Sequence, residues 1–373
     1  MAWRFSQLPK LILKKRGATI MAIKYFTDAN SAAGYVSLQK ENLTGITHVY
    51  HLNSPADTFV HELLEQLATL LTSRRISPEY IYNTFNPALL AGLIIRELDT
   101  AFISGKVVFE HATVIELNHV YDRSKIKENK HLLADLNQSM QMLYEKMYMH
   151  FNAALHIHDE WEKIYIDRID FKKADTFRQT VLSKLFDGAQ GRPREPIIVK
   201  RFFGASTPDG LTDFIPELTT GLTRYLVKGR PGTGKSTLMK AVVKKAMELG
   251  LDLDIYHCAL DPKSLDMVVV PELSFCIFDA TAPHEYEPSL KCDEVLDTYT
   301  AFIRKGTDER CAAVLKSVES KYNNQIKSAK AALKEASELR VEIGAIYKSA
   351  EISSRKEVIF AELIEKIKLT TKR

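Results

Sequence analysis

The chain has 373 residues, of which 45% are hydrophobic and 26% charged, and its formal net charge at pH 7 is +4. This length accommodates two domains of ordinary size, and the composition is typical of globular proteins. So small a net charge gives no indication of nucleic-acid binding. The longest apolar run, 88–95, is far shorter than the ~18 residues that span a membrane, so we expect no membrane partner.

The start of the chain and the cysteines bear on where the protein acts. Residues 1–20 are basic but lack the apolar segment of a secretory signal. Because a more regular stretch opens at Met21, we expect residues 1–21 to be a leader or a mis-called start; a basic targeting peptide or a flexible arm are the alternatives. The cysteines, at 258, 276, 292 and 311, have no C-x-x-C spacing. Reduced thiols and a cytoplasmic location are therefore expected.

Residues 22–186 are expected to form a first domain. Strands are predicted at 80–83 and 101–109, with an apolar segment between them. From 127 to 186 apolar residues recur at helical spacing in a charged sequence. His156 and Glu160 lie four residues apart there, as metal ligands on a helix can, but a solvated helix face explains them as well and is favoured.

Residues 187–196, rich in Gly, Pro and charge, are the predicted linker to a second domain at 197–373. This domain opens with a predicted strand at 197–203 and a turn-rich loop at 204–210. Another strand is expected at 223–227 and an amphipathic helix at 237–249. The last part, 307–373, is strongly helical, with Gly344 as a weak point, and parallels 127–186. Such long helices pack on a neighbour, so they are candidates for a protein partner or for self-association.

Between that strand and that helix, residues 229–236 match G-x-x-x-x-G-K-[ST] without a mismatch. This context predicts a phosphate-binding loop, in which backbone N–H groups and a helix N-terminus bind phosphate oxygens. Lys235 is expected to reach the β- and γ-phosphates, and Ser236 to ligate Mg²⁺. The candidate nucleotide-binding residues are those of this phosphate loop and the residue after it: Gly229, Arg230, Pro231, Gly232, Thr233, Gly234, Lys235, Ser236 and Thr237.

A strand that ends in a carboxylate is predicted after the phosphate loop. Residues 274–279 form an apolar run that ends in Asp279, as expected of the strand that delivers an Asp to the phosphate-bound Mg²⁺. The next residue is Ala280 where many ATPases have a water-activating Glu, which favours kinase-like chemistry or slow hydrolysis. In the polar loop beyond, His284 or Glu285 could orient a nucleophile, and an exposed loop is the equal alternative.

Other polar residues near the ends of these strands give weaker signals. His257, Cys258 and His284 could bind zinc, but their spacing is not diagnostic. Asp261, Asp266 and Glu272 are further candidates without a specific motif. Arg304 and Arg310 are candidates for the arginines of a kinase lid.

The two halves resemble each other at an offset of 176 residues. Phe26 then corresponds to Phe202, and Pro55 to Pro231 inside the phosphate loop. Further matches without a gap are Ala29 with Ala205, Gly34 with Gly210, and Thr44, Gly45 and Thr47 with Thr220, Gly221 and Thr223. After one deletion, at offset 175, Pro87, Glu97 and Leu98 correspond to Pro262, Glu272 and Leu273. A duplication explains this agreement best.

The first copy of the repeat lacks the chemistry of the second. Phe59 and Val60 stand in place of Lys235 and Ser236, and neither can neutralise phosphate or ligate Mg²⁺. Ser104 stands in place of Asp279. The predicted fold is therefore α/β, with two tandem P-loop NTPase-type three-layer halves with helical appendages, the first half degenerate.

These segments resemble a family of bacterial P-loop proteins with two tandem halves, described as ATPases or nucleotide-kinase-like proteins. The resemblance is carried by RFFGASTPDG (201–210), KGRPGTGKST (228–237), DIYHCALDPKSLDMVVVPEL (254–273), FDATAPHEYEP (278–288) and HDEWEKIYI (158–166). It covers most of 22–290 and weakens in the C-terminal helices. It implies ATP binding through Gly229, Gly234, Lys235 and Ser236, and it implies no particular substrate. Both halves of the family can carry a phosphate loop, from which the first half of this chain departs.

The functional expectation is an ATPase that uses Mg²⁺-ATP at the second-half site, through Lys235, Asp279, His284 and Glu285. A nucleotide or small-molecule kinase is one alternative, and a non-catalytic, nucleotide-gated interaction protein is another. The cofactors expected are ATP and Mg²⁺, the latter held by Ser236 and Asp279.

Overall fold

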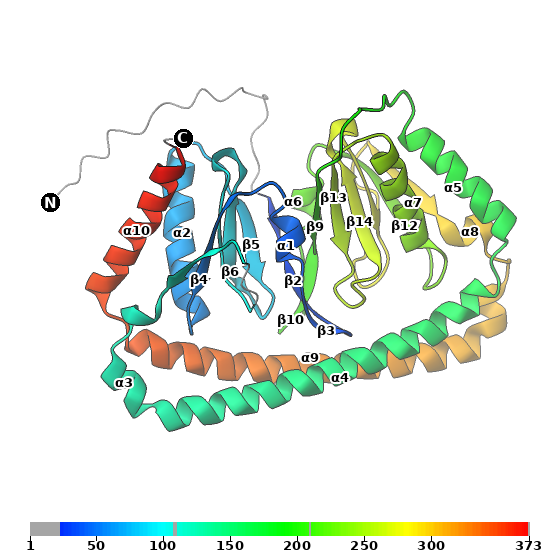
Figure 1. Cartoon of the computed structure of the whole chain (residues 1–373). Helices are drawn as coiled ribbons and strands as arrows, with labels where there is room; N and C mark the ends of the chain where they lie inside the picture. Colours follow the sequence, from blue (N-terminus) through cyan, green and yellow to red (C-terminus); the bar gives the residue numbers. More distant parts are fainter. Residues whose placement is uncertain (1–22, 107–109, 209, 372–373) are drawn as a thin grey trace.

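The computed structural model describes residues 23–106, 110–208 and 210–371. Two mixed sheets lie side by side, each flanked by helices, and two long helices run beneath both (Figure 1). The predicted leader, 1–21, lies outside the described residues. Within the described ranges, no helix combines the length and the apolar character needed to cross a membrane.

The first sheet has the strand order β1-β5-β6-β7-β4-β8. Strand β6 is antiparallel to both of its neighbours, and the other pairs are parallel. Its strands are β1 (Lys24–Tyr25), β4 (His48–Asn53), β5 (Glu79–Asn83), β6 (Asn86–Ile95), β7 (Thr100–Ile103) and β8 (Thr113–Glu116). A hairpin of β2 (Asp28–Ser31) and β3 (Gly34–Ser37), helix α1 (Gln39–Asn42) and helix α2 (Asp57–Ser73) complete this domain.

The second sheet has the strand order β16-β12-β15-β14-β13-β9. Here β14 is the antiparallel strand. The strands are β9 (Ile198–Arg201), β12 (Thr223–Lys228), β13 (Leu253–His257), β14 (Leu265–Val270), β15 (Phe275–Asp279) and β16 (Asp293–Asp297). The hairpin of β10 (Gly204–Thr207) and β11 (Gly210–Asp213), α6 (Ile215–Leu218) and α7 (Lys235–Glu248) occupy the places that β2, β3, α1 and α2 have in the first domain.

The two sheets correspond strand for strand, including the place of the antiparallel strand. Even an irregular turn recurs: the short 3₁₀ helix Arg96–Leu98 after β6 is followed by Asp99 with φ +49°, and the 3₁₀ helix Pro271–Leu273 after β14 by Ser274 with φ +52°. A left-handed backbone is uncommon for residues other than glycine. These two residues are separated by the repeat offset of 175 (274 − 99).

The interface between the domains is closely packed and has a local two-fold character. Phe26 and Phe202, which correspond in the repeat, form an antiparallel bridge with N···O distances of 2.9 and 2.8 Å. Contact between equivalent residues is the geometry of an isologous interface. Inner-face residues of both sheets, among them Ile94 and Met267, share one apolar core. Arg201 is buried within this interface, 3.2 Å from the Glu79 carboxylate.

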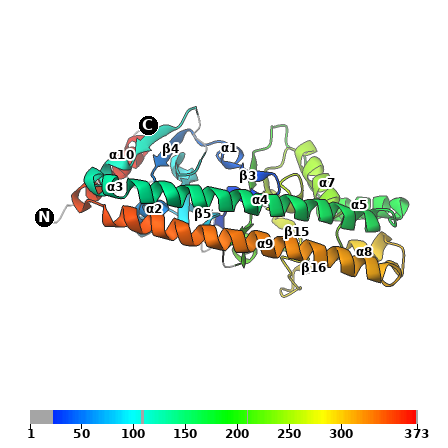
Figure 2. The ribbon, with the colours of Figure 1, turned by 90° about the horizontal axis from the view of Figure 1, so that it is seen from below.

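The two long helices are antiparallel and lie side by side along the whole molecule (Figure 2). Helix α4 (Lys130–Ile166) follows α3 (Arg123–Glu128), and α9 (Thr307–Ser349) follows α8 (Thr298–Phe302). Small residues of α9 receive large ones of α4, as Ala332 and Ala336 do for Phe151 and Tyr144. Helix α9 continues through Gly344, so the predicted weak point there does not interrupt it. Whether the helices also bind another protein stays a prediction.

The helices that follow the long pair cross to the other domain. Helix α5 (Phe171–Leu185) follows α4, yet its Val181 and Leu185 lie in the core of the second sheet. Helix α10 (Ser353–Thr371) follows α9, yet its Ile359 and Leu363 lie in the core of the first sheet. The predicted division at 187–196 therefore leaves each domain with a helix that packs on the other.

Two local expectations from the sequence are wrong. Residues 204–207 and 210–213 form the β10–β11 hairpin, whereas a loop was expected at 204–210. The apolar segment before residue 101 is the long strand β6, and the strand expected at 101–109 is the shorter β7, while 107–109 lie outside the described residues. A buried central strand is apolar throughout, so it lacks the alternation that identifies a half-buried one.

Candidate functional site

Residues 229–236, which were predicted to bind phosphate and are still called the phosphate loop here, join β12 to α7 and have a specific backbone conformation. Gly232 and Gly234 have φ values of +74° and +81°, which glycine adopts without steric cost. Thr233 is fully buried, and its Oγ1 lies 2.8 Å from Thr298 Oγ1 while accepting from the Arg230 N–H at 3.2 Å. A Cβ at Gly229 would lie 2.4 Å from the same Thr233 Oγ1. The loop is therefore anchored to α8 beneath it.

Three of the predicted site residues converge at the end of β12. Asp279 ends β15, which pairs directly with β12. Lys235 Nζ lies 3.6 Å from Asp279 Oδ2 and donates to the Arg230 carbonyl oxygen at 2.9 Å. Ser236, in the first turn of α7, accepts a hydrogen bond at 3.0 Å through Oγ from the Leu265 N–H of β14. The ammonium, the hydroxyl and the carboxylate thus lie at one edge of the sheet.

Asp279 is held in place by its other oxygen. Asp279 Oδ1 accepts from Thr281 N and Oγ1, at 3.0 and 2.5 Å. Asp266 is its neighbour across the β14–β15 pair, whose register sets Met267 opposite Phe278. Burial raises the pKa of Asp266 to about 7, and the nearby Asp279 charge acts in the same direction. No motif in the sequence pointed to Asp266, because its place beside Asp279 depends on the antiparallel strand β14.

The remaining residues of the motif have different surroundings. The Arg230 guanidinium lies 3.1 Å from Asp308 of α9 and 5.3 Å from the ring centroid of Tyr299, so it points to the helices. Pro231 is half-buried and Thr237 is exposed. Among the weaker candidates, Glu272 pairs with Arg192 and Arg194 of the linker, at 3.2 and 3.0 Å.

The loop after β15 contains two predicted site residues, His284, which contacts neighbouring side chains, and Glu285. His284 Nδ1 lies 2.9 Å from Asp213 Oδ2 on β11, and its ring packs edge-on against Phe203 at 4.7 Å between centroids. Glu285 is exposed. The orientation of His284 is therefore fixed by Asp213 of the β10–β11 hairpin and by Phe203, which precedes it. Most of this segment was expected to be a loop.

The corresponding loop of the first domain is filled by side chains. Phe59 and Val60, in place of Lys235 and Ser236, are 0% and 2% exposed and belong to the core that α10 covers. Asp57 pairs with Arg340 of α9 at 2.5 Å. The cations recorded here are already paired with carboxylates: Arg340 with Asp57, and Lys356, which lies 5.5 Å from the Phe59 ring centroid, with Glu62 and Glu351.

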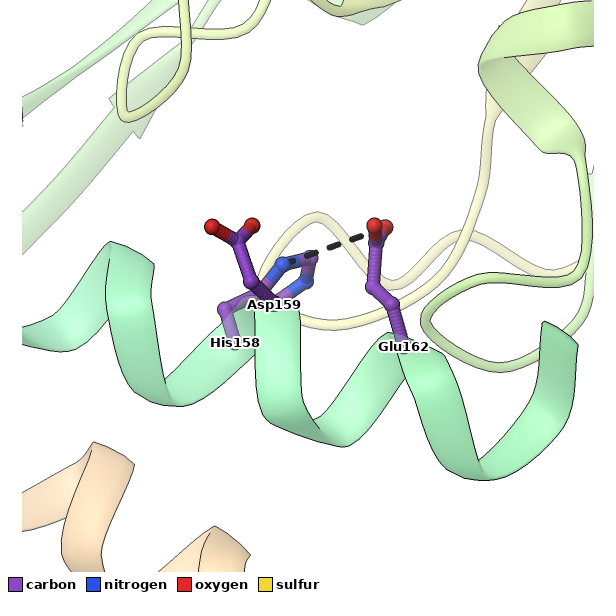
Figure 3. Close-up of side chains that lie close together, drawn as sticks. All are labelled: His158, Asp159 and Glu162. Carbon is purple, nitrogen blue, oxygen red and sulfur yellow. Dashed lines mark ion pairs between the residues drawn. The ribbon is translucent and has the colours of Figure 1, made fainter.

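Helix α4 lies directly over the phosphate loop of the second domain. A Cβ at Gly232 would lie 2.5 Å from the Glu162 carbonyl oxygen. His158, Asp159 and Glu162, here called the α4 cluster, lie on this part of the helix and face the loops of the second domain (Figure 3), and the His158 ring also lies 6.0 Å from the ring of Tyr322 of α9, between centroids. Each offers a ligand atom, and these atoms all lie within 4.8 Å of one another.

The α4 cluster differs from the metal ligands that the sequence suggested. His156 and Glu160 are exposed, in agreement with the solvated helix face. The interacting i,i+4 pair is His158 and Glu162, at 3.9 Å. Periodicity could have identified it, because Phe151, Ala154 and Tyr165 are buried and His158 falls on the same stripe.

The proposed zinc ligands His257, Cys258 and His284 do not form such a group among the described residues. His257 Nδ1 lies 2.7 Å from the Pro262 carbonyl oxygen. Of the two lid candidates, Arg310 donates to the Lys305 carbonyl oxygen at 2.5 Å, and Arg304 is exposed.

Comparison with known proteins adds no family to this geometry: no protein-family model, no curated protein and no solved structure matches the chain.

Proposed function

We propose that the second domain binds a Mg²⁺-nucleoside triphosphate, ATP in the first instance, at the phosphate loop, and hydrolyses it. The first domain is proposed to be a degenerate copy of the same P-loop fold that binds no nucleotide. The correspondence of the two sheets, strand for strand, supports duplication.

The observation that carries the proposal is the convergence of Lys235, Ser236 and Asp279 at the end of β12. A lysine at the start of the helix suits the β- and γ-phosphates, and a hydroxyl with a carboxylate suits Mg²⁺. The two glycines with positive φ suit an anion site, which successive backbone N–H groups form where residues alternate between right- and left-handed conformations. When bound, Mg²⁺ would neutralise charge on the phosphates; Ser236 and Asp279 are the residues that would hold it.

The proposed link between nucleotide and the rest of the molecule is α4. Its Tyr148 donates to Asn30 of the first domain at 2.8 Å, while its Glu162 backbone lies on the phosphate loop of the second. A nucleotide that moves the loop would therefore displace a helix that is attached to both domains. This is the route proposed for coupling hydrolysis to movement between the halves.

Titration with a fluorescent ATP analogue tests the binding site. We expect one nucleotide per chain, loss of binding in Lys235→Ala, and unchanged affinity in Phe59→Leu, the matched change at the equivalent position of the first domain. A stoichiometry of two per chain would refute the single-site proposal. Equal affinities of wild type and Lys235→Ala would refute the assignment of the phosphate loop.

Phosphate release, measured with and without a library of nucleosides and metabolites, tests the reaction. Release that no acceptor changes supports the ATPase. ADP formation that requires an acceptor supports the kinase, which Ala280 in place of a catalytic glutamate keeps open. Binding without either product supports a nucleotide-gated interaction protein.

A further inference from the structure

The α4 cluster combines one imidazole and two carboxylates in a partly enclosed place. His158 and Glu162 are half-buried, Asp159 is exposed, and their ligand atoms are mutually within 4.8 Å. Imidazole favours transition metals, and carboxylate suits Mn²⁺ and Mg²⁺. A mixed set of nitrogen and oxygen ligands therefore fits a cation such as Mn²⁺. The site expected at Ser236 and Asp279 has only oxygen ligands and fits Mn²⁺ less well.

The cluster also faces the phosphate loop. The Glu162 backbone contacts Gly232, as the 2.5 Å approach of a Cβ at that glycine shows. Burial lowers the pKa of His158, the Glu162 charge opposes this, and the positive charge of Lys235 lowers it further. From other elements, Tyr322 of α9 lies near the His158 ring, at 6.0 Å between centroids, and the charges of Lys235 of α7 and Asp261 of the loop after β13 act on the pKa of His158.

The internal repeat supplies an independent observation. Two isolated bridges, Ile169 with Ile303 and Tyr121 with Glu351, relate the helical segments at an offset of 182 (351 − 169 and 303 − 121). At this offset His158 corresponds to Arg340, Asp159 to Val341 and Glu162 to Gly344. Arg340 and Gly344 lie on the first-domain loop, where they contact Asp57 and Thr58.

Both copies of the long helix therefore cover a loop in the same way, but the cation ligands occur only over the intact phosphate loop. Where Lys235 and Ser236 are replaced by apolar residues, the cluster is replaced by an arginine, a valine and a glycine. A solvated helix face would have no reason to follow the state of the loop it covers.

We propose that His158, Asp159 and Glu162 bind a divalent transition-metal cation of the Mn²⁺ class over the phosphate loop. The site is supplied by α4 and is distinct from the Ser236 and Asp279 site. Its role opposite the terminal phosphate rests on the proposed nucleotide binding, whereas cation binding by the cluster does not.

The test uses the full chain and Mn²⁺ alone. The EPR signal of free Mn²⁺ gives the bound fraction, and electron spin-echo modulation from ¹⁴N reports whether an imidazole is a ligand. We expect one bound Mn²⁺ with nitrogen modulation in the wild type. In His158→Ala/Glu162→Gln the modulation should vanish and the Kd should rise by roughly 10- to 100-fold or more.

The control is His156→Ala/Glu160→Gln, which makes the same two changes on exposed positions of the same helix. It should bind Mn²⁺ as the wild type does. Glu162→Gln alone preserves the shape of the side chain and should still weaken binding, which separates loss of a ligand from loss of the fold. Unchanged binding in the double variant, or Mn²⁺ bound without nitrogen modulation in the wild type, would overturn the proposal.

A second titration separates this proposal from the proposed function. Binding of the fluorescent ATP analogue to the wild type is measured with Mg²⁺ present. If Mn²⁺ binds with nitrogen modulation and the nucleotide does not bind, the cation site stands and the nucleotide proposal fails. If the nucleotide binds and the nitrogen modulation is absent, the opposite holds.

Discussion

The contact between α4 and the phosphate loop can be tested with a pair of glycine substitutions. Gly232 and Gly234 have nearly the same left-handed conformation, with φ of +74° and +81°. A Cβ at Gly232 would lie 2.5 Å from the Glu162 carbonyl oxygen and 2.8 Å from its Cα, whereas a Cβ at Gly234 would have nothing within 4 Å. The pair therefore separates the backbone effect of alanine from its collision with the helix.

The expected loss of stability follows from these two effects, the left-handed backbone of alanine and its collision with α4. A left-handed alanine costs about 1–2 kcal/mol at either position. At position 232 the backbone of α4 must also move, and overpacking of this kind costs about 1–3 kcal/mol more. The loss of unfolded-chain entropy on changing Gly to Ala is the same for both variants and cancels in the comparison. We expect Gly232→Ala to be about 1–3 kcal/mol less stable than Gly234→Ala.

Two measurements without nucleotide check this expectation. Urea unfolding should give a lower midpoint for Gly232→Ala than for Gly234→Ala. Hydrogen exchange should accelerate at the C-terminal end of α4, near residue 162, in Gly232→Ala only. If the two variants unfold at the same midpoint and α4 exchanges alike in both, the helix does not lie on the loop and the inference about the α4 cluster loses its geometric basis.

Three further predictions concern single side chains. Asp279→Asn should preserve the fold and metal-free nucleotide binding. The gain in affinity from Mg²⁺ and the rate of turnover should fall by roughly one to three orders of magnitude, because a metal contact is lost. A wild-type rate of ATP turnover would contradict this role of Asp279. Burial raises the pKa of Asp28 to about 6, so this group's contribution to stability is present below its unfolded pKa near 3.8 and is lost as the pH rises through 6. Asp28→Asn should therefore gain up to about 3 kcal/mol relative to wild type between pH 4 and pH 8 in urea unfolding, and a pH-independent difference would exclude the charge as the cause. Arg201→Met should cost about 3–5 kcal/mol, because it leaves the buried Glu79 without one of its cations. The double variant with Glu79→Gln should recover part of that loss; additive effects in a double-mutant cycle would show that the two charges do not interact.

The local features of this protein could be predicted from its sequence. The phosphate loop, its flanking strand and helix, and the strand that ends at Asp279 lie within a few residues of the predicted bounds. Each of these depends on neighbouring residues: glycines that permit positive φ, and apolar residues at helical or strand spacing. The long helices were evident for the same reason.

The tertiary structure decided which distant segments meet. The sequence could not show that α5 and α10 cross to opposite domains, or that the antiparallel strand β14 sets Asp266 beside Asp279. The spacing alone does not distinguish the exposed pair His156 and Glu160 from His158 and Glu162, whereas the apolar stripe of α4, on which His158 falls, does. The periodicity of a helix fixes which side chains share a face, but what that face meets depends on the path of the chain, here one that lays α4 over a loop some 70 residues further on (232 − 162).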